Sequence, residues 1–328
     1  MNVTLLLLSS ASFLMALALT GIVRHYALQQ QLVDIPNERS SHTLPTPRGG
    51  GLGFLLAFSL TLLITLKMAI ANSLNPFYLL GILFPLAVIG FLDDRFDVPS
   101  RIRYLVQLSA AGLAVFWLGM FPQPWLAPLG NVGLVIGVVL TLIGFTALVN
   151  FYNFMDGLDG FVTTVTIIQL SFLALYLHQP MWWLLVAALL GFLYWNWSPA
   201  KIFMGDVGST VLGAAMAIAL LQSPDAATAW SGLAITLPIT GDTIYTLCCR
   251  LVRRENIFQA HRTHIFQRLH QSGLSHAQVC LIYGTLTIVL ASLIYWGGGR
   301  GALSGVLLTL VSIPVAELYF LNRNTAKV

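Results

Sequence analysis

Long apolar runs, separated by short polar segments, occupy most of this chain. A helix of about 17–22 apolar residues crosses the hydrocarbon core of a bilayer, and eleven such spans can be drawn, the second long and the eighth short. The apolar positions are continuous instead of alternating, which argues against a membrane barrel of strands. The predicted spans are residues 4–23, 50–70, 76–92, 102–120, 132–149, 161–177, 182–197, 209–221, 231–249, 278–296 and 302–321.

Composition supports the same interpretation. Hydrophobic residues make up 57% of the 328 residues and charged residues only 9%, whereas about a quarter of the residues of a soluble domain are charged. We expect an all-α polytopic membrane protein of 10–11 transmembrane helices, ten if one span is re-entrant, in a single domain over residues 1–328. The sequence shows no inverted pair of broken helices, which weakens a transporter interpretation.

Basic residues predict the orientation in the membrane. Arg24 and His25 follow the first apolar run, so we expect a retained helix instead of a cleaved signal. Fourteen of the sixteen Lys and Arg residues fall on one side of the spans, which is expected to be cytoplasmic. The N-terminus is then periplasmic and the C-terminus cytoplasmic, in a cell inner membrane. These scattered cations fit phosphate contacts and membrane lipids, and no nucleic-acid partner is expected.

Acidic residues gather on that same side. Eleven of the twelve Asp and Glu residues are predicted there, and only Asp225 lies in a loop on the other side. Charge near lipid is costly and marks function by default. We therefore place the site at the cytoplasmic face.

The first polar segment covers residues 34–51 and contains Pro45, Pro47, Arg48 and three consecutive glycines. Glycines let the backbone approach a ligand closely, and a helix N-terminus beside Arg48 suits an anion. A solvated loop with a glycine-rich helix start is the alternative.

Adjacent carboxylates, Asp93 and Asp94, follow the third span, with Asp97 close behind. Mg²⁺ commonly binds through one or two carboxylates together with substrate phosphates. The alternative is a charged, solvated end of the span.

The most specific motif lies in residues 150–160. Asn150, Asn153, Asp156 and Asp159 are spaced three apart, which places successive side chains near one helix face. No structural need places two carboxamides and two carboxylates at an apolar helix end, so this motif predicts a site.

Two further polar positions lie near helix ends or inside a span. Asp206 lies just before the eighth span and provides another oxygen ligand. Phe203 offers an aromatic face on which a nucleobase could stack. The alternative is that this Phe packs in the core, as a lone Phe usually does. Asp242 lies inside the ninth span near helix breakers, with Thr243 or Arg250 as candidate partners.

The last polar loop contains His261-Arg262-Thr263-His264. It lacks the Glu of the zinc-hydrolase motif. Imidazole and guanidinium donors indicate phosphate binding, or alternatively a basic patch for anionic headgroups.

Together these motifs resemble the polyprenyl-phosphate N-acetylhexosamine-1-phosphate transferase superfamily, glycosyltransferase family 4. They occur in the family's order over residues 34 to about 268. The resemblance implies transfer of an N-acetylhexosamine 1-phosphate from a UDP-sugar to undecaprenyl phosphate, which yields undecaprenyl-diphosphate-sugar and UMP. It also implies Mg²⁺, with Mn²⁺ as a second candidate, and suggests a homodimer.

Residue roles are carried over by the same resemblance. The implied metal ligands are Asp206, Asp156 and Asn153. The implied catalytic residues are Asp93, Asp94, Asp156, Asp206, His261 and His264, with one of the Asp93–Asp94 pair as base or nucleophile. The implied substrate contacts are Arg48, Asn150, Asn153, Asp159, Phe203 and Arg262. All depend on distant segments converging on one magnesium-diphosphate site.

Departures from the family narrow the substrate. The His-Arg-Thr-His sequence replaces the run of consecutive histidines found in muramoyl-pentapeptide transferases, so we expect no pentapeptide. The chain looks more like the branch that initiates O-antigen synthesis, with GlcNAc or a 6-deoxy sugar such as FucNAc or QuiNAc as the sugar. An ion or nucleotide-sugar transporter and a non-enzymatic scaffold are the alternatives from other classes. CDP-alcohol phosphotransferases carry a downstream Ala-Arg that is missing after Gly160.

Overall fold

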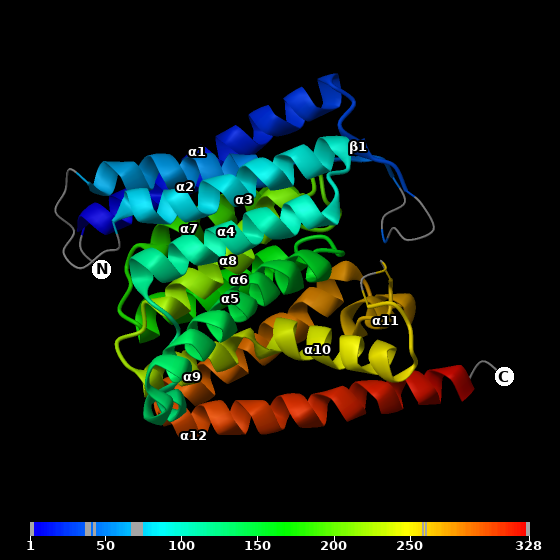
Figure 1. Cartoon of the computed structure of the whole chain (residues 1–328). Helices are drawn as coiled ribbons and strands as arrows, with labels where there is room; N and C mark the ends of the chain where they lie inside the picture. The colour runs from blue at the N-terminus through cyan, green and yellow to red at the C-terminus, as the bar shows by residue number, and fades with distance from the viewer. Residues whose placement is uncertain are drawn as a thin grey trace.

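The structure, a computed structural model, describes residues 3–36, 41, 44–66, 75–257, 259 and 261–325. Within these residues the chain is a bundle of helices (Figure 1), and its strands are limited to a short antiparallel pair, β1 (Val33–Asp34) and β2 (Thr46–Pro47). The all-α polytopic prediction is confirmed. Part of the 34–51 motif, including Glu38 and His42, lies outside the described residues.

Helices follow the predicted spans closely. The α-helices are α1 (Val3–Gln29), α2 (Gly51–Thr65), α3 (Pro76–Phe96), α4 (Ser100–Leu118), α5 (Gly130–Met155), α6 (Phe161–Tyr176), α7 (Trp182–Asn196), α8 (Asp206–Leu221), α9 (Ala226–Leu233), α10 (Leu237–Val252), α11 (Ile265–Gln271) and α12 (His276–Thr325). Two 3₁₀ helices are η1 (Pro124–Leu129) and η2 (Ala234–Thr236).

Four spans differ in detail from the prediction. The second predicted span runs to residue 70, but α2 ends at Thr65, and residues 67–70 lie outside the described part of the chain. The ninth span is built from α9, η2 and α10 in succession. The tenth and eleventh are merged in α12, which is broken at Gly298, where φ is 51°.

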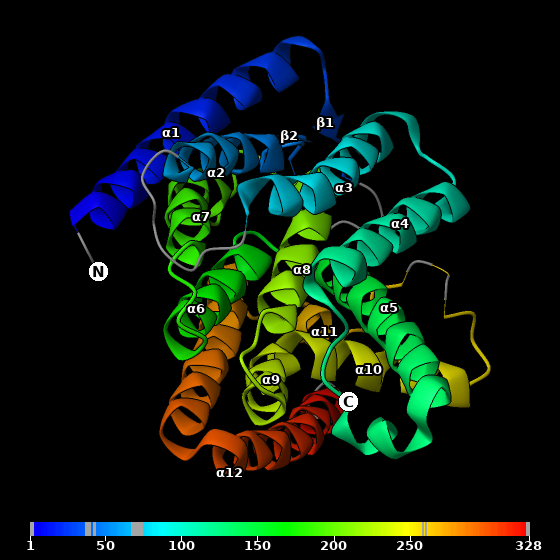
Figure 2. The same ribbon diagram turned by 60° about the vertical axis from the view of Figure 1, so that its left-hand side comes forward.

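Within the described part of the chain, five stretches are long and apolar enough to cross a membrane: Val3–Gln29, Pro76–Phe96, Pro124–Met155, Ala226–Val252 and His276–Asn322. Four shorter apolar helices, α2, α6, α7 and α8, have 15 or 16 residues. At 1.5 Å per residue they are about 24 Å long, a little less than a bilayer core. Of these four, α8 lies in the centre of the bundle, whereas α6 and α7 lie at its left-hand edge in Figure 2.

Helix α8 forms the centre of the bundle, as Figure 2 shows. Every residue from Val207 to Leu220 is buried, and the helix packs on α5, α3 and α2. Small residues permit this close packing in lipid: a Cβ on Gly51 would lie 2.6 Å from the Cα of Gly208. The N-terminus of α8, with Asp206, is therefore held in the middle of one end of the bundle.

That end carries the polar motifs. In Figure 1 strand β1, helix α11 and the C-terminus lie at the right-hand end of the bundle, and the N-terminus lies at the left-hand end. Because α3 and α5 end and α8 begins at the same end, their polar termini meet there.

Candidate active site

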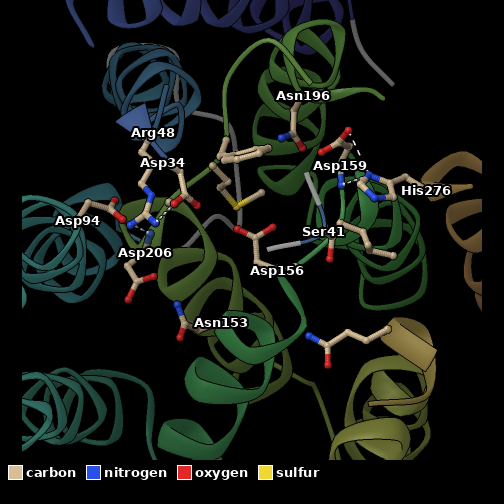
Figure 3. Close-up of a pocket in the computed structure, with 16 residues that line it drawn as sticks. Asp34, Ser41, Arg48, Asp94, Asn153, Asp156, Asp159, Asn196, Asp206 and His276 are labelled. Carbon is tan, nitrogen blue, oxygen red and sulfur yellow. Dashed lines mark hydrogen bonds and ion pairs between the residues drawn. The ribbon is translucent and has the colours of Figure 1, made fainter. Parts of the chain in front are cut away.

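A cavity of about 310 Å³ opens at the polar end of the bundle (Figure 3). Seven of the predicted site residues line it: Arg48, Asp94, Asn153, Asp156, Asp159, Phe203 and Asp206. The other lining residues are Asp34, Ser41, Gly157, Leu158, Asn196, Met204, Gly205, Gln267 and His276. Four of the segments predicted to converge, those that contain Arg48, Asp94, Asp156 and Asp206, therefore share one cavity.

Backbone hydrogen bonds place Arg48 beside Phe203. The N–H of Phe203 donates to the carbonyl of Pro47 at 2.8 Å, and the N–H of Gly50 donates back to the carbonyl of Phe203 at 2.9 Å. Pairing of β1 with β2 brings Asp34 next to Arg48, and the two side chains form an ion pair of 2.5 Å. The glycine-rich segment thus places the guanidinium of Arg48 in the cavity.

The carboxylate of Asp94 accepts hydrogen bonds from the first two backbone N–H groups of α8. Its Oδ1 lies 3.0 Å from the backbone N of Asp206, and its Oδ2 lies 3.4 Å from that of Val207. The first N–H groups of a helix have no partner within it, so this carboxylate satisfies them. Asp94 therefore stabilises the turn that presents Asp206, and both of its oxygens are already engaged.

Asp93 points to a different neighbour. It accepts the N–H of Val98 at 2.8 Å and pairs with Arg103, whose guanidinium also lies 3.2 Å from Asp206. Arg103 lines a second cavity of about 70 Å³ that shares Asn153 and Asp206 with the first. Asp93 itself is not among the lining residues of either cavity.

The end of α5 joins these two cavities. Asn150 lines the smaller one and exchanges hydrogen bonds with Gln107, the shorter at 2.7 Å. Asn153, one turn later, lines both cavities and donates to the hydroxyl of Ser209 at 3.0 Å. Asp156 follows the last residue of the helix and faces the larger cavity.

Electrostatics in the cavity favour a proton or a cation on Asp156. Burial, together with the charges of Asp206, Asp94 and Asp159, raises the pKa of Asp156 to about 8. Part of its side chain remains exposed, on the side that lines the cavity. A positive ion placed there would reverse the shift, because it would favour the ionised carboxylate.

Asp159 is held at the other end of the cavity by a residue that the sequence did not indicate. Its Oδ2 lies 3.1 Å from Nδ1 of His276 and accepts the N–H of Ala200 at 3.1 Å. Burial opposes ionisation, but the hydrogen bond and charge of His276 and the bond from Ala200 outweigh it, so the pKa of Asp159 lies below its ordinary value. His276 starts α12, and a single His before an apolar helix carries no signal in the sequence.

If the donor is the UDP-sugar that the sequence resemblance implies, we expect His276→Phe to raise its KM about tenfold, since a lost hydrogen bond to a charged group costs about 1.5–3 kcal/mol. Asp159 would turn toward other partners, while the groups around Asp206 would stay in place. Steady-state kinetics on the purified protein check this. The control is His25→Phe, at an exposed position on α1. An unchanged donor KM in His276→Phe would contradict the assignment of His276 as the residue that holds Asp159 in the site.

The His261–His264 segment lies beside the cavity instead of lining it. None of His261, Arg262 and His264 is among the residues that line the larger cavity, and His264 is only 2% exposed. Burial, with the nearby charges of His264 and Arg250, lowers the pKa of His261 to about 4, so its ring is neutral near pH 7. In this arrangement Gln267, three residues after His264, reaches the cavity.

Oxygen donors in the cavity suit a magnesium ion only in part. Among the described residues, no three acidic, His or Cys side chains form a group that could hold a metal ion. Carboxylates of Asp94, Asp156 and Asp206 and the amide of Asn153 nevertheless line one cavity. Mg²⁺ is usually bound by one or two carboxylates plus substrate phosphates, so the donor set fits an ion whose remaining ligands come from a phosphate substrate.

Several known proteins are similar in sequence to most of this chain. A probable undecaprenyl-phosphate N-acetylglucosaminyl 1-phosphate transferase of Bacillus subtilis is 29% identical over 310 residues, 87% of this chain and 84% of that protein. An undecaprenyl-phosphate alpha-N-acetylglucosaminyl 1-phosphate transferase of Thermotoga maritima is 30% identical over 253 residues, 76% of this chain and 78% of that protein. A phospho-N-acetylmuramoyl-pentapeptide-transferase of Clostridium botulinum is 29% identical over 271 residues, 75% of this chain and 80% of that protein.

The family model for glycosyl transferase family 4 matches residues 76–223. This stretch runs from the first residue of α3 beyond the last residue of α8 and includes Asp94, Asn153, Asp156 and Asp206. Given this match and the 30% identity to the Thermotoga transferase, the chain belongs to glycosyl transferase family 4.

Proposed function

We propose that this protein transfers an N-acetylhexosamine 1-phosphate from a UDP-sugar to undecaprenyl phosphate, releasing UMP. The observation that carries the proposal is the shared cavity: Arg48, Asp94, Asn153, Asp156 and Asp206 come from four separate segments and line one space. Its volume of about 310 Å³ is at the lower end of the range for small-molecule sites.

Charge in the cavity supports a divalent cation. Five carboxylates line it, against one arginine and one histidine, and a diphosphate would be repelled by them. A bound Mg²⁺, or Mn²⁺ in its place, would neutralise that charge and polarise the phosphoryl group. Asp206, Asp156 and Asn153 are the side chains that we expect to hold it, together with oxygens of the diphosphate.

Two ends of the cavity suit two parts of the donor. Arg48, Asp94 and Asp206 lie together on one side in Figure 3, and Asp159, His276 and Asn196 lie on the other, with Asp156 between them. The first side suits the diphosphate. The ring of Phe203 can stack on uracil, and an oxygen of Asp159 can accept the N–H of the uracil base.

The acceptor is expected to approach along α5. An apolar cavity of about 550 Å³ is lined by Leu140, Gly144 and Phe151 of that helix and by residues of α8, η2 and α10. It suits an isoprenoid chain. The small cavity with Arg103 and Asn150 shares Asp206 with the donor site, and Arg103 would hold the acceptor phosphate there.

Chemistry at this site needs little help from a base. The second pKa of a phosphate monoester is about 6, so the acceptor is already mostly ionised near pH 7. Its oxygen attacks the β-phosphorus of the donor, the bond to UMP breaks, and undecaprenyl-diphosphate-sugar forms. Both carboxylate oxygens of Asp94 accept backbone N–H groups at the N-terminus of α8. This favours a positioning role for Asp94 over a role as the nucleophile.

We also propose the orientation and pathway. The two termini lie at opposite ends of the bundle (Figure 1), which supports a periplasmic N-terminus and a cytoplasmic C-terminus and site in the inner membrane. The sugar is GlcNAc or a 6-deoxy N-acetylhexosamine, and its lipid-linked product initiates O-antigen synthesis.

The assay that tests the proposal uses membranes expressing the chain, undecaprenyl phosphate, Mg²⁺ and a panel of radiolabelled UDP-sugars. Label should enter the lipid extract with equal release of UMP, and the panel identifies the sugar. Because a pentapeptide transferase is among the relatives, UDP-N-acetylmuramoyl-pentapeptide is one donor in the panel. Transfer from that donor alone would replace the proposed substrate, and no transfer from any donor would refute the activity.

Removal of the cation should expose the titration of Asp156. Its pKa is raised by burial, so the neutral form is the one that the fold favours, and the stability that it contributes is lost as pH rises toward about 8. In EDTA we expect the Tm to fall as the pH rises from about 5 to about 8 and to level off above that pH, relative to the same protein in Mg²⁺. Differential scanning fluorimetry measures it. Asp156→Asn should remove the difference, and an equally flat Tm in EDTA for both proteins would contradict the prediction.

A further inference from the structure

A buried carboxylate outside the cavity accepts four hydrogen bonds. Asp242 lies in α10 and is 4% exposed. Its Oδ1 accepts the hydroxyl of Thr246 at 3.1 Å and the backbone N–H of Ile265 at 2.9 Å. Its Oδ2 accepts the backbone N–H of Phe266 at 3.1 Å and the hydroxyl of Tyr283 at 2.7 Å. The donors come from three helices, α10, α11 and α12.

The partners expected from the sequence are engaged elsewhere. The hydroxyl of Thr243 donates to the carbonyl of Ile239 at 2.9 Å. Arg250 pairs with Glu255 at 2.7 Å and donates to the carbonyl of Asn256 at 2.7 Å. An unpaired carboxylate inside a helical bundle is costly. Here backbone N–H groups and hydroxyls provide the compensation, together with His264, whose Nδ1 lies 3.5 Å from Oδ1 of Asp242. Asp242 therefore binds main chain that is 23 and 24 residues away.

The main chain that it holds is the start of α11. This helix directly follows His264. A helix this short contributes little stability of its own, so its place depends on such contacts. A second contact, between Arg268 and Glu317 of α12, includes a hydrogen bond of 2.8 Å. α11 is thus attached to the bundle at its first two residues and again at Arg268 in its middle.

On its opposite side, α11 touches the motif of residues 150–160. The ring of Phe266 stacks on Phe161 with centroids 4.9 Å apart and planes 10° apart. A Cβ built on Gly157 would lie 3.4 Å from Cζ of Phe266 and 3.5 Å from Nε2 of Gln267. Gln267 is also the residue of α11 that lines the cavity. A displacement of α11 would therefore move a wall of the cavity next to Asp156 and Asp159.

We infer that Asp242 is a positioning residue for the donor site. Its carboxylate holds α11 against Gly157, so that Gln267 forms part of the cavity wall and contacts the bound nucleotide-sugar. That the ligand is a nucleotide-sugar rests on the proposed function; that Asp242 holds α11 rests on the geometry alone. Asp242 itself touches no substrate.

The test compares wild-type protein with Asp242→Asn, which has the same size but replaces one acceptor oxygen by an NH₂ group. That group would face a backbone N–H or a hydroxyl. We expect the KM for the UDP-sugar to rise about tenfold, equivalent to about 1.4 kcal/mol, with the KM for undecaprenyl phosphate unchanged. Hydrogen–deuterium exchange of peptides covering residues 261–271 should accelerate about tenfold, while α8 peptides stay as in wild type.

Matched variants separate positioning from a general loss of stability. Thr246→Val removes one hydroxyl and leaves both backbone hydrogen bonds, so the donor KM should change less than about twofold. Gln267→Ala should raise the donor KM by itself. Asp242 is inferred to act through α11. The donor KM of the double variant Asp242→Asn/Gln267→Ala should therefore be no higher than that of whichever single variant has the higher donor KM.

Three results would overturn the inference: unchanged exchange of residues 261–271 in Asp242→Asn, equal rises in both KM values, or additive effects in the double variant. If Asp242→Asn does not fold, Tyr283→Phe replaces it. That variant loses one of the four hydrogen bonds and must shift exchange and donor KM in the same direction; no shift counts against the inference. A wild type without transferase activity would refute the proposed function, while the exchange measurement would still decide the role of Asp242.

Discussion

Asp206→Asn is expected to lower transfer by about a thousandfold or more, with the protein still folded. This carboxylate stands at the start of α8, lines both polar cavities and lies 3.2 Å from Arg103. Asparagine keeps the shape and removes the charge that a cation and the developing charge of the reaction need. Initial rates of UMP release, at saturating donor and Mg²⁺, measure the effect.

Asp225→Asn is the matched control. Asp225 also begins a helix, because its side chain accepts the N–H of Thr228 at 2.9 Å at the start of α9. Asparagine is an equally good residue at that position, and α9 lies at the other end of the bundle in Figure 1. The control should keep wild-type activity. Wild-type rates in Asp206→Asn would exclude Asp206 from the site.

Gly205→Ala is expected to lower transfer by about a hundredfold and to lower stability as well. Gly205 has φ of +75°, and a Cβ there would lie 2.3 Å from Oδ2 of Asp94. The methyl group would expel Asp94 from the N-terminus of α8 and shift Asp206. A displacement of about 1 Å in an active site can cost a hundredfold in rate, and the left-handed backbone adds about 1–3 kcal/mol of strain.

Gly112→Ala provides the comparison, since nothing lies within 4 Å of a Cβ at that helical position in α4. It should leave rate and Tm close to wild type. The loss in Gly205→Ala should exceed the loss of folded protein, which size-exclusion chromatography and Tm report. Activity that falls only in proportion to folded protein would show that the close contact with Asp94 is structural alone.

Local patterns were sufficient to predict most of the helices. Each apolar run is long enough to require an internally hydrogen-bonded helix in lipid, so the spans follow from the sequence with small errors at their ends. Helix α11 was not predicted, because its seven residues depend on contacts with Asp242, Glu317 and Phe161. The break at Gly298, in contrast, falls between the tenth and eleventh predicted spans.

Seven of the predicted site residues line the cavity, whereas their hydrogen-bond partners were not predicted. The residues 150–160 and Asp206 stand out because polar side chains at apolar helix ends have no structural explanation. That Asp94 binds the N-terminus of α8 could not be inferred, since the two lie 112 residues apart. The same holds for His276 and Gln267, which reach the cavity through the packing of α12 and α11.

The sequence by itself indicated that this chain crosses a membrane and predicted that its carboxylates lie near one face, because hydropathy and charge act on each segment independently. Only the tertiary structure decided which carboxylates share a cavity and which serve the fold. Asp206 and Asp156 line the site, whereas Asp242 satisfies the backbone of α11. The physical reason is that a buried charge must find donors, and which donors lie within about 3 Å is set by helix packing.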